Sequence, residues 1–408
     1  MSGRPNTADV LIVGGGFVGL TLAAALSRAG IASAVIEERA AGRAAAKDGR
    51  TSAIAYGSAQ VLRGLGIWPR LEPVAEPILE IRVSDGTAPL FLHYDHRELE
   101  GRLADAPLGY MVENDDLKRV LLDHVAGLSN VALITGVTVR RLARNSDGVR
   151  AELSDGGAIE ARLAVAADGR DSALRREAGI AVARWRYPQT AIVCTVAHEK
   201  PHRGIAHERF LPAGPFAILP MKGKRSSIVW TESAKNAPRL LALPDAEFKA
   251  ELSRRFGDFL GKIEVVGGRW SYPLGLVHAD RYVAERLVLA GDAAHAIHPI
   301  AGQGLNLGFR DVAVLAEVLA DARKAGRDIG AAEVIRRYER WRRFDSFALI
   351  AATDSLNRLF SNDFAPVRLA RDLGLAAVNR VPGLKRFFMR HAMGLVGDLP
   401  RLMRGEPL

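Results

Sequence analysis

The chain is organised around one stretch, Arg286-Leu-Val-Leu-Ala-Gly-Asp-Ala-Ala-His295, which continues as Ala-Ile-His-Pro-Ile-Ala-Gly-Gln-Gly-Leu-Asn-Leu-Gly-Phe-Arg-Asp311. The apolar run 287–290 predicts a buried strand, and Asp292 places a carboxylate at the carboxyl end of that strand. A loop rich in Pro and Gly follows, and a helix is expected to begin near Leu305. A carboxylate accepts hydrogen bonds from a polyol, glycine backbone can lie against a flat ring, and a helix N-terminus attracts an anion. The ordered set therefore predicts a site for a ligand with all three properties.

A second glycine-rich stretch lies near the N-terminus. Its parts are, in order, a strand over 8–13, the glycines Gly14, Gly16 and Gly19, a helix over 20–29, and a strand over 32–36 that leads into Glu37. The first two glycines permit a tight turn and the close approach of a pyrophosphate, and the third lets the helix pack on the strand. Glu37 is placed to bind the hydroxyls of an adenosine ribose. This order predicts a dinucleotide site, in which the charge of Glu37 disfavours a 2′-phosphate.

Two further segments carry candidate ligand contacts. A buried strand is expected to end at Asp168, Gly169 turns the chain, and Ser172 is placed to cap the next helix. Arg43 and Arg50 follow the second strand of the dinucleotide motif. These arginines either reach phosphate groups and the edge of the ring or belong to a solvated loop, and both alternatives stay open.

Composition excludes several classes of protein. A chain of 408 residues with 48% hydrophobic and 25% charged residues is typical of a soluble globular protein of two or three domains. The single cysteine, Cys194, excludes an intramolecular disulfide framework and a thiolate metal cluster, and no metal site is predicted. The uncharged run 10–27 is broken by glycines, which disfavours a signal peptide or a membrane-spanning helix.

The net charge of +10 is concentrated toward the C-terminus. From Pro366 onward, 8 Lys and Arg stand against 3 Asp and Glu. Basic excess of this kind suggests nucleic acid, an anionic membrane or solubility alone, and the sequence contains no recognisable nucleic-acid-binding module. The segment 382–395 can form an amphipathic helix with basic side chains, which suits either a membrane surface or packing on the protein itself.

The remaining segments indicate a mixed architecture. Residues 77–95 alternate apolar and polar around Ser84-Asp-Gly86, which predicts a hairpin. Residues 181–273 are rich in strand patterns with one helix over 245–256, and helices are expected over 331–347 and 348–360.

The order Gly-x-Gly-x-x-Gly, Asp-Gly and Gly-Asp resembles that of the FAD-dependent aromatic hydroxylases, the class A flavin monooxygenases, over nearly the whole chain. Three longer segments are similar to the ubiquinone-biosynthesis hydroxylases: 48–58, 108–114 and 298–311. The resemblance implies an α/β fold like that of para-hydroxybenzoate hydroxylase. It implies a discontinuous Rossmann-like FAD-binding domain (1–73, 98–180, 274–330), a β-sheet substrate domain (74–97, 181–273) and a helical C-terminal region (331–408).

The resemblance also implies roles for individual residues. FAD would be bound by Gly14, Gly16, Gly19, Glu37, Arg43, Arg50, Asp168, Asp292, Gly302, Gly304, Leu305 and Asn306. Asn114 departs from the Arg or Gln that relatives often have near the flavin. Pro299 and Gln303 are the candidates for the reactive face of the ring. His295 and His298 are either general bases or structural histidines.

The implied reaction is hydroxylation of the ring of a polyprenylphenol through a flavin hydroperoxide, with O₂ and NAD(P)H. A second Gly-x-Gly-x-x-Gly motif is missing, so NADH or NADPH is expected to bind as a transient co-substrate. Alternatives are a monooxygenase of a small soluble aromatic, a reductase of isoprenoid double bonds, and a non-catalytic FAD-binding scaffold. Homo-oligomers, a ubiquinone biosynthetic complex and a membrane surface are the candidate partners. The expected location is the cytoplasm, or the periphery of the inner face of the membrane.

Overall fold

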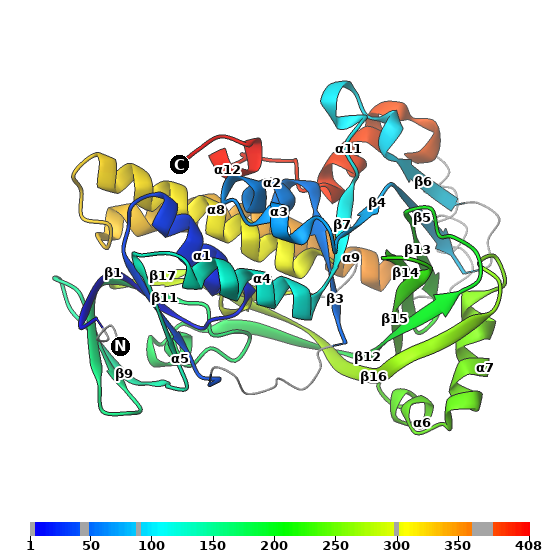
Figure 1. Cartoon of the computed structure of the whole chain (residues 1–408), viewed down its shortest axis with the longest axis horizontal. Helices are drawn as coiled ribbons and strands as arrows, with labels where there is room; N and C mark the ends of the chain where they lie inside the picture. Colours follow the sequence, from blue (N-terminus) through cyan, green and yellow to red (C-terminus); the bar gives the residue numbers. More distant parts are fainter. Residues whose placement is uncertain (1–4, 41–48, 87–90, 298–301, 361–377) are drawn as a thin grey trace.

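The structure is a computed structural model, in which the strands form two eight-stranded sheets and one three-stranded sheet (Figure 1). It describes residues 5–40, 49–86, 91–297, 302–360 and 378–408, with the backbone alone over 347–360. The α/β class expected from the sequence is confirmed.

The first sheet has a parallel core, in the order β17-β18-β11-β1-β2-β8. Its parallel strands are β1 (Thr7–Val13), β2 (Ser33–Glu37), β8 (Val131–Thr135), β11 (Ala158–Ala166) and β18 (Leu287–Leu289). Antiparallel strands extend it: β9 (Val139–Arg144), β10 (Val149–Leu153) and β17 (Val283–Ala284). Val10, Leu11 and Ile12 are fully buried, because a parallel sheet is covered on both faces.

Helices pack on this sheet and on one another. They are α1 (Phe17–Arg28), α2 (Tyr56–Gly64), α3 (Trp68–Leu71), α4 (Asn114–Ala126), α5 (Ala173–Glu177) and α8 (Gln303–Lys324). A Cβ on Gly308 of α8 would lie 2.6 Å from Val18 Cγ2, so the glycine is what allows α1 to approach α8 this closely.

Because these strands are parallel, the carboxyl ends of β2, β1, β11 and β18 meet along one edge of the first sheet, beside the helices that follow them.

The second sheet, in the order β19-β16-β12-β15-β14-β13-β5-β6, lies beside the first. Its strands are β5 (Glu80–Asp85), β6 (Phe91–Asp95), β12 (Val182–His198), β13 (Ile205–Leu211), β14 (Gly214–Met221), β15 (Arg225–Ser233), β16 (Ile263–Ala279) and β19 (His295–Ala296). The expected hairpin is confirmed by the antiparallel pairing of β5 with β6. On one face, buried Cys194 and Trp230 pack against α6 (Ala237–Leu241) and α7 (Asp245–Phe256). This face is called the outer face below.

The opposite, inner face of the second sheet meets a three-stranded sheet. That sheet consists of β3 (Thr51–Ala55), β4 (Glu76–Ile78) and β7 (Gly109–Glu113). Thr51 Oγ1 donates to Ser227 Oγ at 2.8 Å, and Met111 shares a buried cluster with Met221. The second sheet thus takes its strands from residues 80–95, 182–279 and 295–296. The exact domain boundaries stay a prediction.

The C-terminal part is helical, with α9 (Ala332–Phe360), α11 (Pro382–Ala392) and α12 (Arg401–Arg404). The expectation of two helices over 331–360 is wrong, because α9 is continuous through the join at 347–348. Short 3-10 turns η1 (His96–Glu98) and η2 (Gly101–Leu103) lie against α11. Among the described residues, no helix is both long enough and apolar enough to span a membrane.

Candidate active site

The glycine-rich turn after β1 brings backbones into close contact. Gly14 has a φ of +109°, and a Cβ there would lie 2.2 Å from Ala167 O. A Cβ on Gly19 would lie 1.9 Å from Gly14 O, so α1 packs on the turn only without a side chain at that position. An added Cβ on Gly16 would meet no described atom within 4 Å. The turn is therefore tight on one side and open on the other, as a pyrophosphate site requires.

Glu37 ends β2 beside this turn. Its Oε1 accepts a hydrogen bond from Arg39 N at 3.0 Å, and a Cβ on Gly15 would lie 2.8 Å from its Oε2. Lys118 of α4 donates from Nζ to Gly15 O, and burial lowers the pKa of Lys118 although nearby Glu37 raises it. Lys118 was missed in the sequence, where it is only a lysine beside apolar helix positions.

Asp168 follows β11 and caps α5. Its Oδ2 accepts hydrogen bonds from Ala173 N at 2.9 Å and Leu174 N at 3.4 Å. Its Oδ1 is buried and has no hydrogen-bond partner among the described residues. The predicted cap is confirmed, since Ser172 Oγ accepts from Arg175 N at 3.1 Å. Asp168 thus combines a structural role with one carboxylate oxygen left over for a donor on a ligand.

The buried guanidinium of Arg175 joins the Asp-Gly turn to the Gly-Asp turn. Nη1 donates to Ala293 O at 2.8 Å, and Nη2 donates to Arg170 O at 2.9 Å. Both acceptors are backbone carbonyls, so the side chain sets the distance between two turns that are far apart in sequence. Sequence reasoning had no signal for this contact.

Asp292 follows β18, in the 3-10 turn η3 (Gly291–Ala293). Its side chain is exposed, yet burial raises the pKa of Asp292 against the opposing effects of Arg170, His295 and Arg50. Arg50 and Arg170 lower the pKa of Asp292 through their charges, so both side chains lie near this carboxylate.

A fully buried group of charges lies behind the Gly-Asp turn. Asp311 Oδ2 accepts from Gly291 N at 2.8 Å and lies 2.7 Å from His295 Nε2, while its Oδ1 accepts from Arg342 Nε at 2.7 Å. Burial raises the pKa of Asp311, but His295 and Arg342 outweigh it, so the pKa lies below its ordinary value. His295 is buried beside Asp311, which favours the structural alternative for this residue. Asp311 and Arg342 were missed, although a charged residue on an otherwise apolar helix face was a possible signal.

The first turn of α8 is tied to β3. Gly302 has a φ of +62°, and a Cβ on it would lie 2.8 Å from Ala53 Cβ. Asn306 Oδ1 accepts from Ala55 N at 2.8 Å, and its Nδ2 donates to Ala53 O at 2.8 Å and Gly302 O at 2.9 Å. The Asn306 amide is thus used within the protein. The backbone N–H groups of Gly304 and the adjoining first-turn residues remain the part of this element suited to an anion.

The other predicted residues fall in different places. Arg50 lies 5.0 Å from the Tyr272 ring centroid, so it packs on the second sheet and is not confined to a solvated loop. Asn114 is buried at the start of α4, where its Oδ1 accepts from Ser52 Oγ at 2.7 Å. Gln303 Nε2 donates to Ala392 O at 3.5 Å, at the end of α11.

Two of the predicted contacts, Arg43 and Pro299, lie outside the described residues, as does His298. Leu305 is partly buried against the core of the first sheet. No position proposed from the sequence is displaced to a remote surface among the residues that the structure describes.

The edge of the first sheet fits a dinucleotide. Gly14, Glu37, Asp168 and Asp292 follow four neighbouring strands, at the crevice where α/β sheets bind ligands. The open backbone at Gly16 and the buried, unpartnered Oδ1 of Asp168 suit a group that brings phosphates and hydroxyls.

The fold and this crevice define a flavoprotein of the FAD-dependent aromatic monooxygenase class. The chain belongs to the FAD binding domain family, which it matches over residues 7–346.

Individual relatives cover the chain almost completely. Ubiquinone hydroxylase UbiL from Rhodospirillum rubrum is 55% identical over an alignment of 408 positions, which covers 99% of this chain and 94% of that protein. 3-Demethoxyubiquinol 3-hydroxylase from Escherichia coli is 36% identical over 97% of this chain and 100% of its own length. The crystal structure of p-nitrophenol 4-monooxygenase PnpA from Pseudomonas putida has a TM-score of 0.80 over 97% of this chain and 100% of its own, at 22% identity. That similarity shows the fold alone.

Proposed function

We propose that this protein is an FAD-dependent monooxygenase that hydroxylates the aromatic ring of a prenylated phenol in ubiquinone biosynthesis, with NAD(P)H and O₂ as co-substrates. The observation that carries the proposal is the 55% identity to UbiL over 99% of the chain. The crevice at the edge of the first sheet supports it, because that crevice suits a bound dinucleotide.

FAD, when bound, supplies the redox chemistry, because its ring takes electrons from NAD(P)H and then reacts with O₂. Our proposal places the pyrophosphate against Gly14, Gly16 and Gly19, and the adenosine ribose against Glu37. Arg43 and Arg50 line the groove, and Asp168 and Asp292 accept hydrogen bonds from the cofactor. Asn114 contacts FAD less directly in this proposal, because its Oδ1 already accepts a hydrogen bond from Ser52.

The loop before α8 would lie along the reactive ring. The N–H groups at Gly302 to Asn306 stabilise negative charge on that ring through the helix N-terminus. Pro299 and Gln303 are the proposed contacts on the reactive face. Gln303 also holds the end of α11, which couples the position of that helix to the ring.

The experiment that tests this function is lipid analysis by mass spectrometry in the source organism with the gene deleted. We expect ubiquinone to be lost and a prenylphenol lacking one hydroxyl to accumulate. The wild-type gene should restore ubiquinone, whereas a gene carrying Asp292→Ala should not. Unchanged ubiquinone in a strain without a second hydroxylase of this kind would contradict the proposal and favour a small soluble aromatic as substrate.

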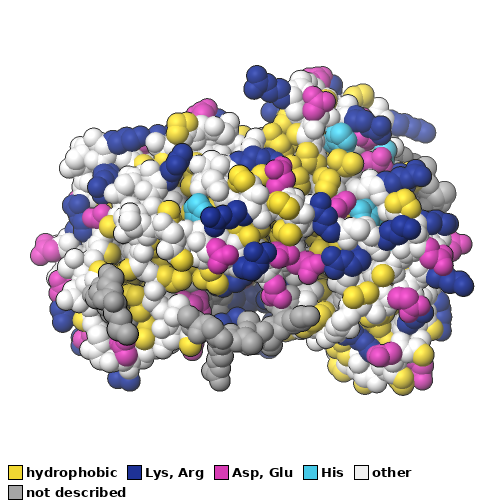
Figure 2. All heavy atoms as spheres, viewed as in Figure 1, with side chains coloured by type: hydrophobic (Ala, Val, Ile, Leu, Met, Phe, Trp, Pro, Cys, Tyr) yellow, Lys and Arg dark blue, Asp and Glu magenta, His cyan; other side chains and the backbone are white. Residues whose placement is uncertain are grey.

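We also propose that α11 rests on an anionic membrane surface. The helix is apolar on two sides: Met389 and Met393 are buried, whereas Leu384, Phe387 and Phe388 are 41%, 50% and 39% exposed. Figure 2 shows hydrophobic side chains gathered on this part of the molecule. The two alternatives for 382–395 are therefore compatible, because one side packs on the protein while the other is free.

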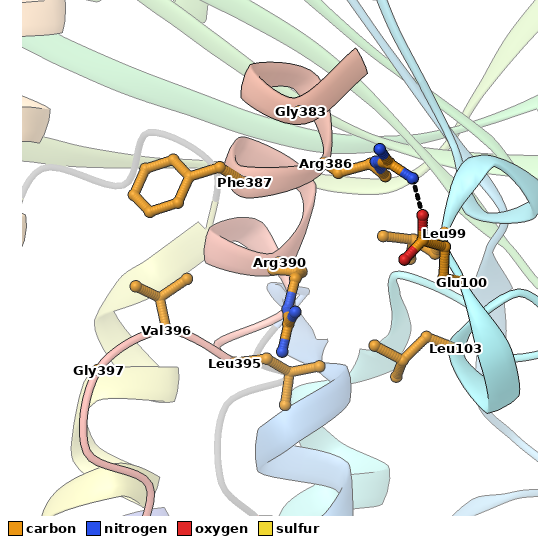
Figure 3. A pocket seen from close by; sticks show the side chains of 10 residues that line it. All are labelled: Leu99, Glu100, Leu103, Gly383, Arg386, Phe387, Arg390, Leu395, Val396 and Gly397. Carbon is orange, nitrogen blue, oxygen red and sulfur yellow. Dashed lines mark hydrogen bonds and ion pairs between the residues drawn. The ribbon is translucent and has the colours of Figure 1, made fainter.

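The cations beside this surface are not all available to lipid. Lys385 is buried with its Nζ 2.7 Å from Glu98 Oε1, and Arg386 pairs with Glu100 (Figure 3). Arg390 is exposed and lines a cavity of about 510 Å³, together with Leu103, other residues of α11 and the segments before η2 and after α11. The cavity opens beside the exposed aromatic residues, which suits an apolar chain held near the membrane.

Point variants test the membrane surface better than a deletion, because α12 and the inner side of α11 are part of the core. Phe387→Ser with Phe388→Ser should abolish sedimentation with vesicles of anionic phospholipid and leave FAD content unchanged. Phe344→Ser, at an exposed position 77% accessible on α9, is the matched control. Equal sedimentation of all three proteins would contradict a role for α11.

A further inference from the structure

One acidic side chain on the inner face of the second sheet differs from the other carboxylates of that sheet. Glu208 lies on β13, opposite Ala217 of β14 and Val83 of β5. Among the described residues it has no hydrogen bond or ion pair. Glu80 of β5 and Glu264 of β16, in contrast, are paired with Arg82 and Lys249.

The strand register places Glu208 between two apolar clusters. Alternate residues of a strand share a face, so Glu208 points to the same side as Ala206 and Phe210. Ala206 packs in a cluster with Met111 and Met221, and Phe210 packs in another with Leu92. Their neighbours His207 and Arg209 point to the outer face, where both contact Phe259.

This face reaches Gly302, at the start of α8, through one apolar cluster. The cluster around Ala206 includes Ala53, whose Cβ would lie 2.8 Å from a Cβ on Gly302. Glu208 is two residues further along β13, which is about 7 Å. The carboxyl group therefore lies on the same face of the second sheet as the cluster that reaches the start of α8, where our proposal places the reactive ring.

The surroundings of Glu208 favour its neutral form. The side chain is half-buried, so solvent reaches it, yet burial alone raises its pKa from 4.5 to about 7. Because no described protein group pairs with this half-buried carboxylate, it can accept a hydrogen bond from the hydroxyl group of a ligand.

Few other titratable groups face this position from the elements packed around it. They are Asp85 on β5, Tyr94 on β6 and Glu76 on β4; Glu76 lies 4.0 Å from His202 and from Lys222. Arg380, beyond Val378 of the Phe210 cluster, is exposed. Burial raises the pKa of the Tyr94 hydroxyl, which makes Tyr94 a hydrogen-bond donor and not a base near neutral pH.

We propose that Glu208 contacts the hydroxyl group of the phenol substrate and takes its proton as the ring is hydroxylated. The inference rests on the proposed function. A ring carbon forms a bond to one oxygen atom derived from O₂ as the O–O bond breaks, while the phenolic O–H bond breaks and its proton moves to a Glu208 carboxylate oxygen. The resulting dienone then loses the proton from that carbon to solvent, and Glu208 returns its proton to the ketone oxygen. NAD(P)H supplies the two electrons that convert the second oxygen atom to water.

The acidity of the two partners fits this transfer. A phenol has a pKa of about 10, so a base whose pKa is about 7 accepts its proton with a smaller penalty than an ordinary Glu. The apolar clusters on either side of Glu208 suit the ring and the start of a prenyl chain. A substitution that removes the charge of Glu208 and keeps its shape should therefore lower turnover more than it weakens substrate binding.

The test compares the wild-type holoenzyme with Glu208→Gln, with Glu264→Gln as the matched control on an exposed edge of the same sheet. Hydroxylated product from a short-chain prenylphenol is measured by mass spectrometry between pH 6 and 9. Substrate affinity is measured separately from the change in flavin absorbance on binding. Glu208→Asp is included as the variant that keeps the acid.

We expect wild-type kcat to rise with pH toward a plateau above about 7. Glu208→Gln should lower kcat by about 100-fold, remove that rise and change substrate affinity by less than about 3-fold. Glu208→Asp should restore part of the activity together with the rise. Glu264→Gln should behave as the wild type does.

Four outcomes would overturn the inference. If Glu208→Gln has the same kcat as the wild type, Glu208 has no role in turnover. If its kcat is lower but rises with pH as in the wild type, Glu208 is a structural residue. If Tyr94→Phe removes the rise of kcat with pH while Glu208→Gln does not, the Tyr94 hydroxyl is the group that contacts the phenol, and the inference fails. If the wild type forms no hydroxylated product, the proposed function fails first and the role of Glu208 fails with it.

Discussion

Two interior carboxylates, one behind the edge of the first sheet and one on the inner face of the second, have opposite surroundings. Asp311, behind the first edge, is fully buried and is contacted by Gly291, His295 and Arg342. Glu208, on the second face, is half-buried and has no described partner. Their pKa values move accordingly, downward for Asp311 and upward to about 7 for Glu208.

The difference separates two uses of buried charge. Both carboxylate oxygens of Asp311 have partners, which connect the turn at Gly291 with His295 and Arg342. Such a network maintains geometry. Around Glu208 the charge is left without compensation, which lowers stability and keeps a group available for a ligand. Substitutions should therefore damage folding in the first region and chemistry in the second.

The largest expected effect comes from breaking the network behind the first sheet. Arg342→Met leaves Asp311 buried without its cation and should lower the free energy of unfolding by about 3–5 kcal/mol in urea denaturation. Arg337→Met is the control, since Arg337 is 42% exposed and pairs with Asp321 at 2.9 Å. That change should cost less than about 1 kcal/mol. Equal losses would show that the buried network is no more important than a surface pair.

The glycine turn sharpens the same contrast within the first region. Gly19→Ala places a Cβ 1.9 Å from Gly14 O and should lower the free energy of unfolding by about 2–3 kcal/mol. Gly16→Ala meets no described atom and should leave the stability of the FAD-free protein almost unchanged while weakening FAD binding. The measurements are urea denaturation and fluorescence titration with FAD. Strong FAD binding by Gly16→Ala would contradict close approach of the pyrophosphate there.

In the second region, removing the carboxylate should raise the free energy of unfolding instead of lowering it. Because the folded pKa of Glu208 is about 7 and the ordinary value is 4.5, the native state retains this proton through that window. Stability from Glu208 is thus present below pH 4.5 and lost as pH rises through about 7. At pH 8 the free energy of unfolding of Glu208→Gln should be about 2 kcal/mol higher than that of the wild type, a difference smaller than the full pKa shift implies because solvent screens part of the charge. At pH 5 the two proteins should have similar stability. A variant less stable than wild type at pH 8 would contradict an uncompensated charge.

The smallest effect should come from the contact that joins the two regions. Thr51→Val removes the hydrogen bond to Ser227 Oγ and should lower the free energy of unfolding by about 1 kcal/mol. FAD affinity should stay within about 2-fold of wild type, because the Thr51 side chain is directed to Ser227 of the second sheet. A large loss of FAD would mean that the second sheet helps to shape the cofactor site.

Much of the first region was predictable because its requirements are local. Gly14, Gly16 and Gly19 stand at a fixed spacing after a strand, and a tight turn needs that spacing whatever the rest of the chain does. Ser172 caps its helix as its position indicated. The continuous α9 was not predicted, because helical patterns on both sides of residue 347 do not reveal whether the helix is interrupted.

The sequence by itself determined the fold class, the order of strand, glycine turn and helix, and the carboxylates that follow the strands. These are properties of short segments, in which backbone conformation and apolar spacing depend on neighbours along the chain. Only the tertiary structure decided that Arg175 joins two turns, that Asp311 pairs with Arg342, and that Glu208 has no described partner. Those facts depend on which distant segments pack together, because pairing and desolvation are set by neighbours in space.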